Sequence, residues 1–220
     1  MAIVIAIDGP AGAGKSTIAR RLASRLGFTY IDSGAMYRAV ALWALRQKLD
    51  TADHHRMEQL ARAAAITLES DGRVILNGED VTEAIRGPEV SAGASRVATI
   101  PGVRRALVEK QRAIGEQDNV VMEGRDIGSV VFPDADLKIF LDADVQERAT
   151  RRAAEVNGDR ELISRQLRER DERDRSRPEA PLTQAPDAVY VDSTGRSIED
   201  IEEEILRLVR ARISNGKEFR

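Results

Sequence analysis

The residues with the clearest chemical potential form a glycine-rich loop near the start of the chain. Residues 9–16 read Gly-Pro-Ala-Gly-Ala-Gly-Lys-Ser and match the phosphate-binding pattern G-x-x-x-x-G-K-[S/T]. Glycines let backbone N–H groups turn inward around phosphate oxygens, and a helix that begins near Lys15 adds its positive dipole end. We expect Lys15 to reach the β- and γ-phosphates of ATP, and Ser16 to hold Mg²⁺. The expected ATP-binding residues are Gly9, Pro10, Ala11, Gly12, Ala13, Gly14, Lys15, Ser16 and Thr17.

A second candidate segment, residues 32–38, reads Asp-Ser-Gly-Ala-Met-Tyr-Arg and follows a short predicted strand. Ser33 either caps the helix that begins here or holds a ligand. Arg38 lies one helical turn beyond Gly34, so its guanidinium is expected to reach the same cavity. Arginine suits phosphate because its planar fork binds two oxygens at once.

A third candidate segment, residues 123–128, reads Glu-Gly-Arg-Asp-Ile-Gly after another predicted strand. Ligands of open α/β sheets collect beyond the carboxyl ends of the strands, where this segment is expected to lie. Arg125 and Asp126 are therefore candidate ligand contacts. The alternative is a surface turn that is closed by an ion pair.

A fourth candidate segment, residues 147–177, contains ten arginines, eight acidic residues and no lysine. On a helix, Arg170, Arg173 and Asp174 would share one face with Arg177. Such a run is often a solvated face laced with ion pairs. The complete bias toward arginine favours a phosphate-binding lid, which excludes water so that ATP is not hydrolysed.

The elements that must position these residues follow from apolar periodicity. Strands are expected over residues 2–7, 28–31, 119–122, 137–141 and 189–191, and helices over 15–26, 35–46, 53–65, 89–98, 102–115 and 198–213. Two further helices are expected within 145–177. This alternation predicts a three-layer α/β fold of the P-loop NTPase type with a parallel five-stranded sheet.

Residues 66–76 depart from this rhythm, because short apolar runs with turn dipeptides predict a β-hairpin. We interpret residues 53–86 as a small inserted subdomain and residues 147–177 as the helical lid. The core then comprises residues 1–52, 87–146 and 178–220. We expect residues 214–220 to fray.

Composition narrows the possible chemistry. The 220 residues carry a net charge of −3, so no global attraction to nucleic acid is expected. The chain has no cysteine, and its only two histidines, His54 and His55, are adjacent, which argues against thiolate, zinc and Ser-His-Asp chemistry. No apolar run reaches the roughly 20 residues that span a bilayer. We therefore expect a cytoplasmic protein whose partners are small molecules. We expect a monomer because no dimer surface is obvious in the sequence.

Six segments together resemble the bacterial cytidylate kinases. They are IDGPAGAGKST at residues 7–17, DSGAMYR at 32–38, ASRVATIPGVRRALVEKQR at 94–112, EGRDIGSVVFPDADLKIFLDA at 123–143, RDERDRSR at 170–177 and VYVDSTGRSIEDI at 189–201. The resemblance runs essentially end to end. It implies a nucleoside monophosphate kinase that phosphorylates CMP and dCMP with ATP, and in which residues 53–86 form the monophosphate-binding insertion.

The resemblance also implies roles for individual residues. The implied substrate contacts are Ser33, Arg38, Ser95, Arg104, Arg125, Asp126, Asp174 and Arg177. Ser95, Arg125 and Asp126 would surround the cytosine, and Asp174 would bind the sugar hydroxyls with its partner Arg177. Arg38 would hold the α-phosphate, and Arg104 would lie beside the ribose and base. The implied catalytic residues are Lys15, Arg148, Arg170 and Arg173.

Two positions depart from the family pattern. Ser16 stands where relatives often have glycine before Thr17, so either hydroxyl is a candidate Mg²⁺ ligand. Glu123 stands where aspartate is common, which keeps an acid but changes its reach by one methylene. Neither departure affects the implied reaction.

The chemistry of cytosine agrees with the implied base contacts. Asp126 can accept a hydrogen bond from the exocyclic amine while Arg125 donates to a ring acceptor. Uracil would leave Asp126 facing a carbonyl, so we expect CMP to be preferred over UMP by about 10²-fold or more. The alternatives are a shikimate- or adenylate-type kinase and a nucleotide-dependent switch. A guanine-reading N-K-x-D segment is absent, which argues against the switch.

Overall fold

The computed structural model describes residues 2–69 and 71–213, which form two compact units. The first comprises the described residues of Met1–Tyr30 and Asp118–Arg220, and the second comprises those of Ile31–Gln117. The tail that we expect to fray, residues 214–220, lies outside the described residues. Within the described residues, no helix is long and apolar enough to cross a membrane.

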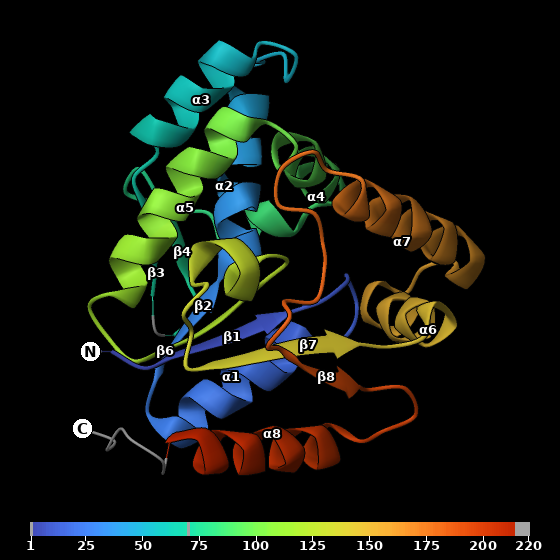
Figure 1. The fold of residues 1–220 in the computed structure, drawn as a ribbon. Helices are drawn as coiled ribbons and strands as arrows, with labels where there is room; N and C mark the ends of the chain where they lie inside the picture. Colours follow the sequence, from blue (N-terminus) through green and yellow to red (C-terminus); the bar gives the residue numbers. More distant parts are fainter. Residues whose placement is uncertain (1, 70, 214–220) are drawn as a thin grey trace. The chain divides into compact units, whose positions relative to one another are not determined.

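The first unit is built on a parallel sheet (Figure 1). Its strands are β1 (Val4–Asp8), β6 (Val120–Gly124), β7 (Leu137–Asp142), β8 (Val189–Asp192) and β2 (Thr29–Asp32), whose last residues belong to the second unit. The strand order is β2-β6-β1-β7-β8. Ile5 pairs with Val121 on one side and with Leu137 on the other, both in parallel register. The predicted P-loop α/β fold with a five-stranded parallel sheet is confirmed.

Four helices and one π-helical turn complete the first unit. They are α1 (Lys15–Leu26), α6 (Val145–Val156), α7 (Arg160–Arg175), α8 (Ile198–Ile213) and the π-helix Ile127–Val131. Both α1 and α8 cover the same face of the sheet (Figure 1). Leu22 of α1 and Ile205 of α8 are fully buried there with Ile5 and Ile139 from the strands. This apolar layer fixes the start of α1, where the glycine-rich loop ends.

The second unit is mainly helical. Its elements after β2 are α2 (Ser33–Arg46), α3 (His54–Ala63), β3 (Ile66–Leu68), β4 (Val74–Leu76), β5 (Glu79–Asp80), a 3₁₀ turn (Ala84–Arg86), α4 (Pro88–Val97) and α5 (Pro101–Gly115). Its core includes the fully buried side chains of Met36, Met57 and Leu107.

Three local expectations need correction. Asp32, not Ser33, caps α2, because its carboxylate accepts a hydrogen bond from Ala35 N. The helices expected from 89 and 102 begin one residue earlier at prolines, which have the backbone angle required at a first helical position. The expected hairpin gains a third antiparallel strand, β5, because Glu79 and Asp80 pair with β4.

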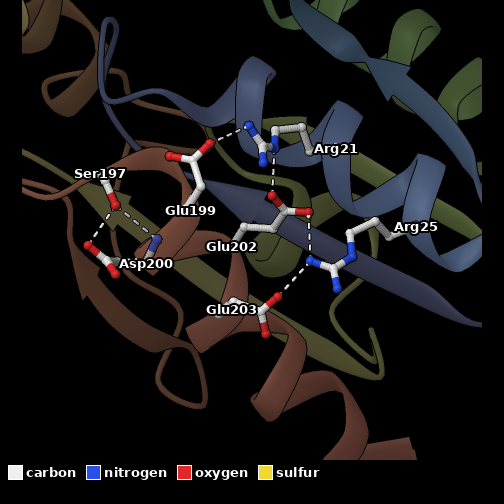
Figure 2. A network of polar contacts seen from close by, with 7 residues as sticks. All are labelled: Arg21, Arg25, Ser197, Glu199, Asp200, Glu202 and Glu203. Atoms are coloured by element: carbon white, nitrogen blue, oxygen red, sulfur yellow. Dashed lines mark hydrogen bonds and ion pairs between the residues drawn. The ribbon is translucent and has the colours of Figure 1, made fainter.

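An ion-pair network joins α8 to α1 (Figure 2). The Glu202 side chain is only 2% exposed, and its two oxygens contact Arg21 Nε at 2.5 Å and Arg25 Nη1 at 3.3 Å. Glu199 and Glu203 add outer contacts to the same two arginines at 2.9 and 2.6 Å. Glu202 is therefore the central carboxylate that holds the two helices together.

Glu202→Gln is expected to lower the melting temperature by about 2–4 °C, because it leaves two arginines without their buried partner. Glu203→Gln removes a carboxylate that is 53% exposed, and exposed pairs contribute little. Thermal unfolding of both variants measures the difference. Equal melting temperatures would contradict a central role for Glu202.

Candidate active site

The glycine-rich loop connects the central strand of the sheet to a helix whose N-terminus is open. Gly9 follows β1 with φ of 149°, and a Cβ there would lie 1.9 Å from the Leu141 carbonyl oxygen. Only glycine fits this close approach to β7. Gly14 is the N-cap of α1 and supplies no side-chain hydrogen bond, so phosphate oxygens can take the first-turn N–H groups.

Lys15 lies buried inside this loop. Its side chain is only slightly exposed, and Nζ donates a hydrogen bond to the Pro10 carbonyl oxygen at 2.7 Å. Burial, together with the positive charges of Arg125 and Arg170, lowers the pKa of Lys15 to about 7, against the opposing influence of Glu123 and Asp8. The loop therefore presents a desolvated cation among other cations, which a bound polyanion would stabilise.

Asp8 is a site residue that the sequence analysis did not assign. It ends β1, and its two carboxylate oxygens accept hydrogen bonds from Ile127 N at 2.8 Å and Gly128 N at 2.7 Å. Burial raises the pKa of Asp8 to about 6 despite these bonds. Asp8 thus ties the strand before the phosphate-binding loop to the turn after Asp126. The available signal was an acid at the end of an otherwise apolar strand.

Four of the eight expected substrate contacts lie in the first unit, and three of these four are bonded together. Arg125 Nε donates to Asp174 Oδ2 at 3.0 Å, and Arg177 pairs with Asp174 Oδ1. Burial alone would raise the pKa of Asp174, but the charges of Arg125, Arg177 and Arg170 outweigh it and hold the pKa below its usual range. Asp126 is buried directly after Arg125.

These contacts argue against the surface turn that was one alternative for residues 123–128. The side chain of Asp174 is 1% exposed and that of Arg125 is 17% exposed, so this ion pair is not a surface turn. Arg177 lies beyond the end of α7, whose last residue is Arg175, so it does not extend the helical face as expected. It reaches Asp174 from the following loop instead.

The other four expected substrate contacts belong to the second unit. Ser33 is buried in the first turn of α2, and Ser95 is buried in α4. Arg38 Nη2 donates to Asp32 Oδ2 at 2.8 Å, so the helix cap also orients this arginine. Arg104 of α5 is buried, and its guanidinium lies 5.9 Å from the centre of the Tyr37 ring. Arg38 and Arg104 thus each make a contact within their own unit.

The three expected lid arginines differ in their surroundings. Arg148 of α6 is buried and bonded to Ala143, Ala11 and Asp171. Arg170 of α7 is half-buried, and its charge acts on both Lys15 and Asp174. Arg173 is exposed, and its Nε donates to the Glu169 carbonyl oxygen at 3.2 Å. The charge of Arg170 therefore acts on the buried cation of the glycine-rich loop.

Comparison with known proteins shows which sequences and which fold this chain is similar to. Residues 5–211 match the family model described as cytidylate kinase. A cytidylate kinase of Solibacter usitatus is 63% identical, with 99% of this chain and 96% of that protein covered. One of Pelotomaculum thermopropionicum is 49% identical, with 97% and 96% covered. A gluconokinase structure from Sinorhizobium meliloti shares the fold at a TM-score of 0.52 and 13% identity, covering 97% of this chain and 95% of its own.

Proposed function

This chain belongs to the cytidylate kinase family, and we propose that it transfers the γ-phosphoryl group of ATP to CMP and dCMP, yielding CDP and dCDP. The observation that carries the proposal is that Lys15 belongs to the same compact unit as the bonded cluster of Arg125, Asp174 and Arg177, which we call the acceptor cluster. The charge of Arg125 in this cluster helps to lower the pKa of Lys15 in the donor loop. A phosphotransferase that joins two polyanions needs such convergent cations.

We assign base recognition to Arg125 and Asp126, with Ser95 from the second unit. Asp126 is buried, so a base that left its carboxylate facing a carbonyl would be strongly disfavoured. Asp174 and Arg177 would bind the sugar, and the existing Arg125–Asp174 bond holds the carboxylate in place beforehand. Arg38 would bind the α-phosphate, with Arg104 beside the ribose and base.

The transfer step would proceed in line, with no covalent intermediate. Lys15 and Arg170 would neutralise the charge that develops on the transferring group, with Arg173 joining from the exposed side of α7. Residues 147–177, as the lid, would exclude water that would otherwise compete with the phosphate oxygen of CMP that accepts the phosphoryl group. The insertion 53–86 remains the proposed monophosphate-binding domain, and a cytoplasmic monomer remains the expected state.

The residues around the loop fit Mg²⁺ that arrives with the nucleotide. The described residues contain no cluster of three or more His, Cys, Asp or Glu side chains that would hold a metal by themselves. Ser16 and Thr17 are exposed in the first turn of α1, where either hydroxyl could serve as a ligand. Mg²⁺ is commonly held by few protein ligands together with substrate phosphates. When bound, it would neutralise phosphate charge.

A coupled ADP-release assay with and without CMP tests the proposed reaction. We expect ADP release to require CMP or dCMP, with shikimate and AMP inactive as acceptors. The nucleotide-dependent switch predicts ATP turnover that CMP leaves unchanged. A shikimate-type kinase predicts activity with shikimate alone.

ATP binding is expected to take up protons above pH 7. The pKa of Lys15 in the free protein is about 7, and a neighbouring triphosphate favours the charged form, so the pKa rises on binding. The affinity for ATP should therefore fall with pH above this value, by at most about tenfold per pH unit for one proton. Titration calorimetry between pH 6.5 and 8.5 measures this slope.

Lys15→Arg supplies the control, because arginine stays charged throughout this range. The ATP affinity of the variant should depend less on pH. Calorimetry in buffers of different ionisation enthalpy should show that the variant takes up fewer protons on ATP binding than the unaltered protein. Identical slopes for the two proteins would rule out Lys15 as the titrating group.

A further inference from the structure

A buried ion pair connects α7, through Arg148 of α6, to the backbone of the phosphate-binding loop. Arg148 and Asp171 are each about 4% exposed, and Arg148 Nη2 lies 2.7 Å from Asp171 Oδ2. The other guanidinium nitrogens donate to the carbonyl oxygens of Ala143 at 2.9 Å and Ala11 at 3.0 Å. All three nitrogens of Arg148 are therefore used by the protein itself.

These contacts hold the backbone of the loop. Arg148 Nη1 holds the carbonyl of Ala11, and a Cβ at Gly12 would lie 3.2 Å from Arg148 Cβ. One turn further along α6, Arg151 bonds to Ser193, whose hydroxyl donates to the Ala13 carbonyl oxygen at 3.2 Å. Arg148 thus bonds the Ala11 carbonyl directly, and Arg151 acts on the Ala13 carbonyl through Ser193, so α6 restrains the backbone of the loop at two points.

The two buried acids of α7 contact different parts of the proposed site. Asp171 contacts Arg148, which in turn bonds to the glycine-rich loop. Asp174, one turn later, contacts Arg125 in the acceptor cluster. Arg170, next to Asp171, influences Lys15. A buried ion pair adds little net stability compared with apolar packing, so stability alone does not explain Arg148 and Asp171.

We propose that Asp171 is a positioning residue for the ATP half of the site, acting through Arg148 on the carbonyl of Ala11. Arg148 is then a positioning residue rather than a catalytic one. The proposal rests on the function proposed above. It predicts that a substitution of Asp171 weakens the binding of ATP, whereas a substitution of Asp174 weakens that of CMP.

The test is a pair of isosteric variants, Asp171→Asn and Asp174→Asn. Asp171→Asn should weaken ATP binding by about 10-fold or more and leave the KM for CMP and the CMP/UMP preference close to those of the unaltered protein. Asp174→Asn should raise the KM for CMP and leave ATP binding nearly unchanged. Titration calorimetry with MgATP alone, in the absence of CMP, measures the donor half independently of turnover.

Arg148→Lys gives a second reading if Asp171→Asn does not fold. Lysine keeps the charge but cannot bond three separate acceptors, so ATP binding should weaken here as well. Wild-type ATP affinity in either folded variant would overturn the proposal, as would equal losses for ATP and CMP, which indicate a general structural defect. If the unaltered protein binds ATP but forms no CDP, the proposed function fails instead.

Discussion

Lys15→Met is expected to lower kcat by about 10³-fold while the melting temperature stays at or above that of the unaltered protein. The loss in kcat follows from removing the buried cation of the loop, whose charge counters the negative charge on the transferring phosphoryl group. The retained or raised melting temperature has a separate cause. Burial lowers the pKa of Lys15 to about 7, so the folded protein bears a cost for holding this charge, and methionine of similar length removes that cost.

Lys48→Met is the matched control, because Lys48 is exposed in the second unit and belongs to neither half of the site. It should leave kcat and both KM values unchanged. Steady-state kinetics and thermal unfolding of the two variants measure the contrast. A Lys15→Met protein that is folded and keeps more than about a tenth of the original kcat would contradict the role of Lys15.

Asp126→Asn is expected to collapse the preference for CMP over UMP from about 10²-fold to within about tenfold. The asparagine amide can donate to the uracil carbonyl that the carboxylate would repel, so UMP improves while CMP loses a charge-assisted bond. The effect should be large because Asp126 is only 5% exposed. The ratio of kcat/KM for the two acceptors is the quantity to measure.

Asp134→Asn controls for the loss of one carboxylate in the same connection between β6 and β7, because Asp134 is exposed. It should keep the original ratio. An Asp126→Asn protein that still discriminates 10²-fold would show that another group reads the base, and Arg125 would be the next residue to substitute.

Local patterns made the donor loop and most elements predictable. The spacing from Gly9 to Lys15 is a property of consecutive residues, and the strands around it are apolar throughout because both of their faces are buried. The N-cap of α2 shows the limit of local reasoning. Asp32 and Ser33 are both good capping residues, and the choice between them depends on the path by which β2 enters the helix.

Long-range contacts explain what the sequence could not reveal. The first two N–H groups of the π-helix Ile127–Val131 donate hydrogen bonds to Asp8. Asp8 lies more than a hundred residues earlier in the chain. The arginine-rich segment is also mixed, since Asp171 and Asp174 are buried while Arg173 is exposed. Composition showed that residues 147–177 carry many charges, but only the partners Arg148 and Arg125 determine which acids turn inward.

The most direct test of the acceptor assignment is a competition between monophosphates. Equimolar CMP, UMP and AMP are incubated with limiting ATP labelled in its γ-phosphate, and the labelled diphosphates are separated and counted at early times. Nearly all of the label should appear in CDP, with UDP lower by about 10²-fold. Label shared equally between CDP and UDP, or found mainly in ADP formed from AMP, would contradict the account of Arg125 and Asp126 as readers of cytosine.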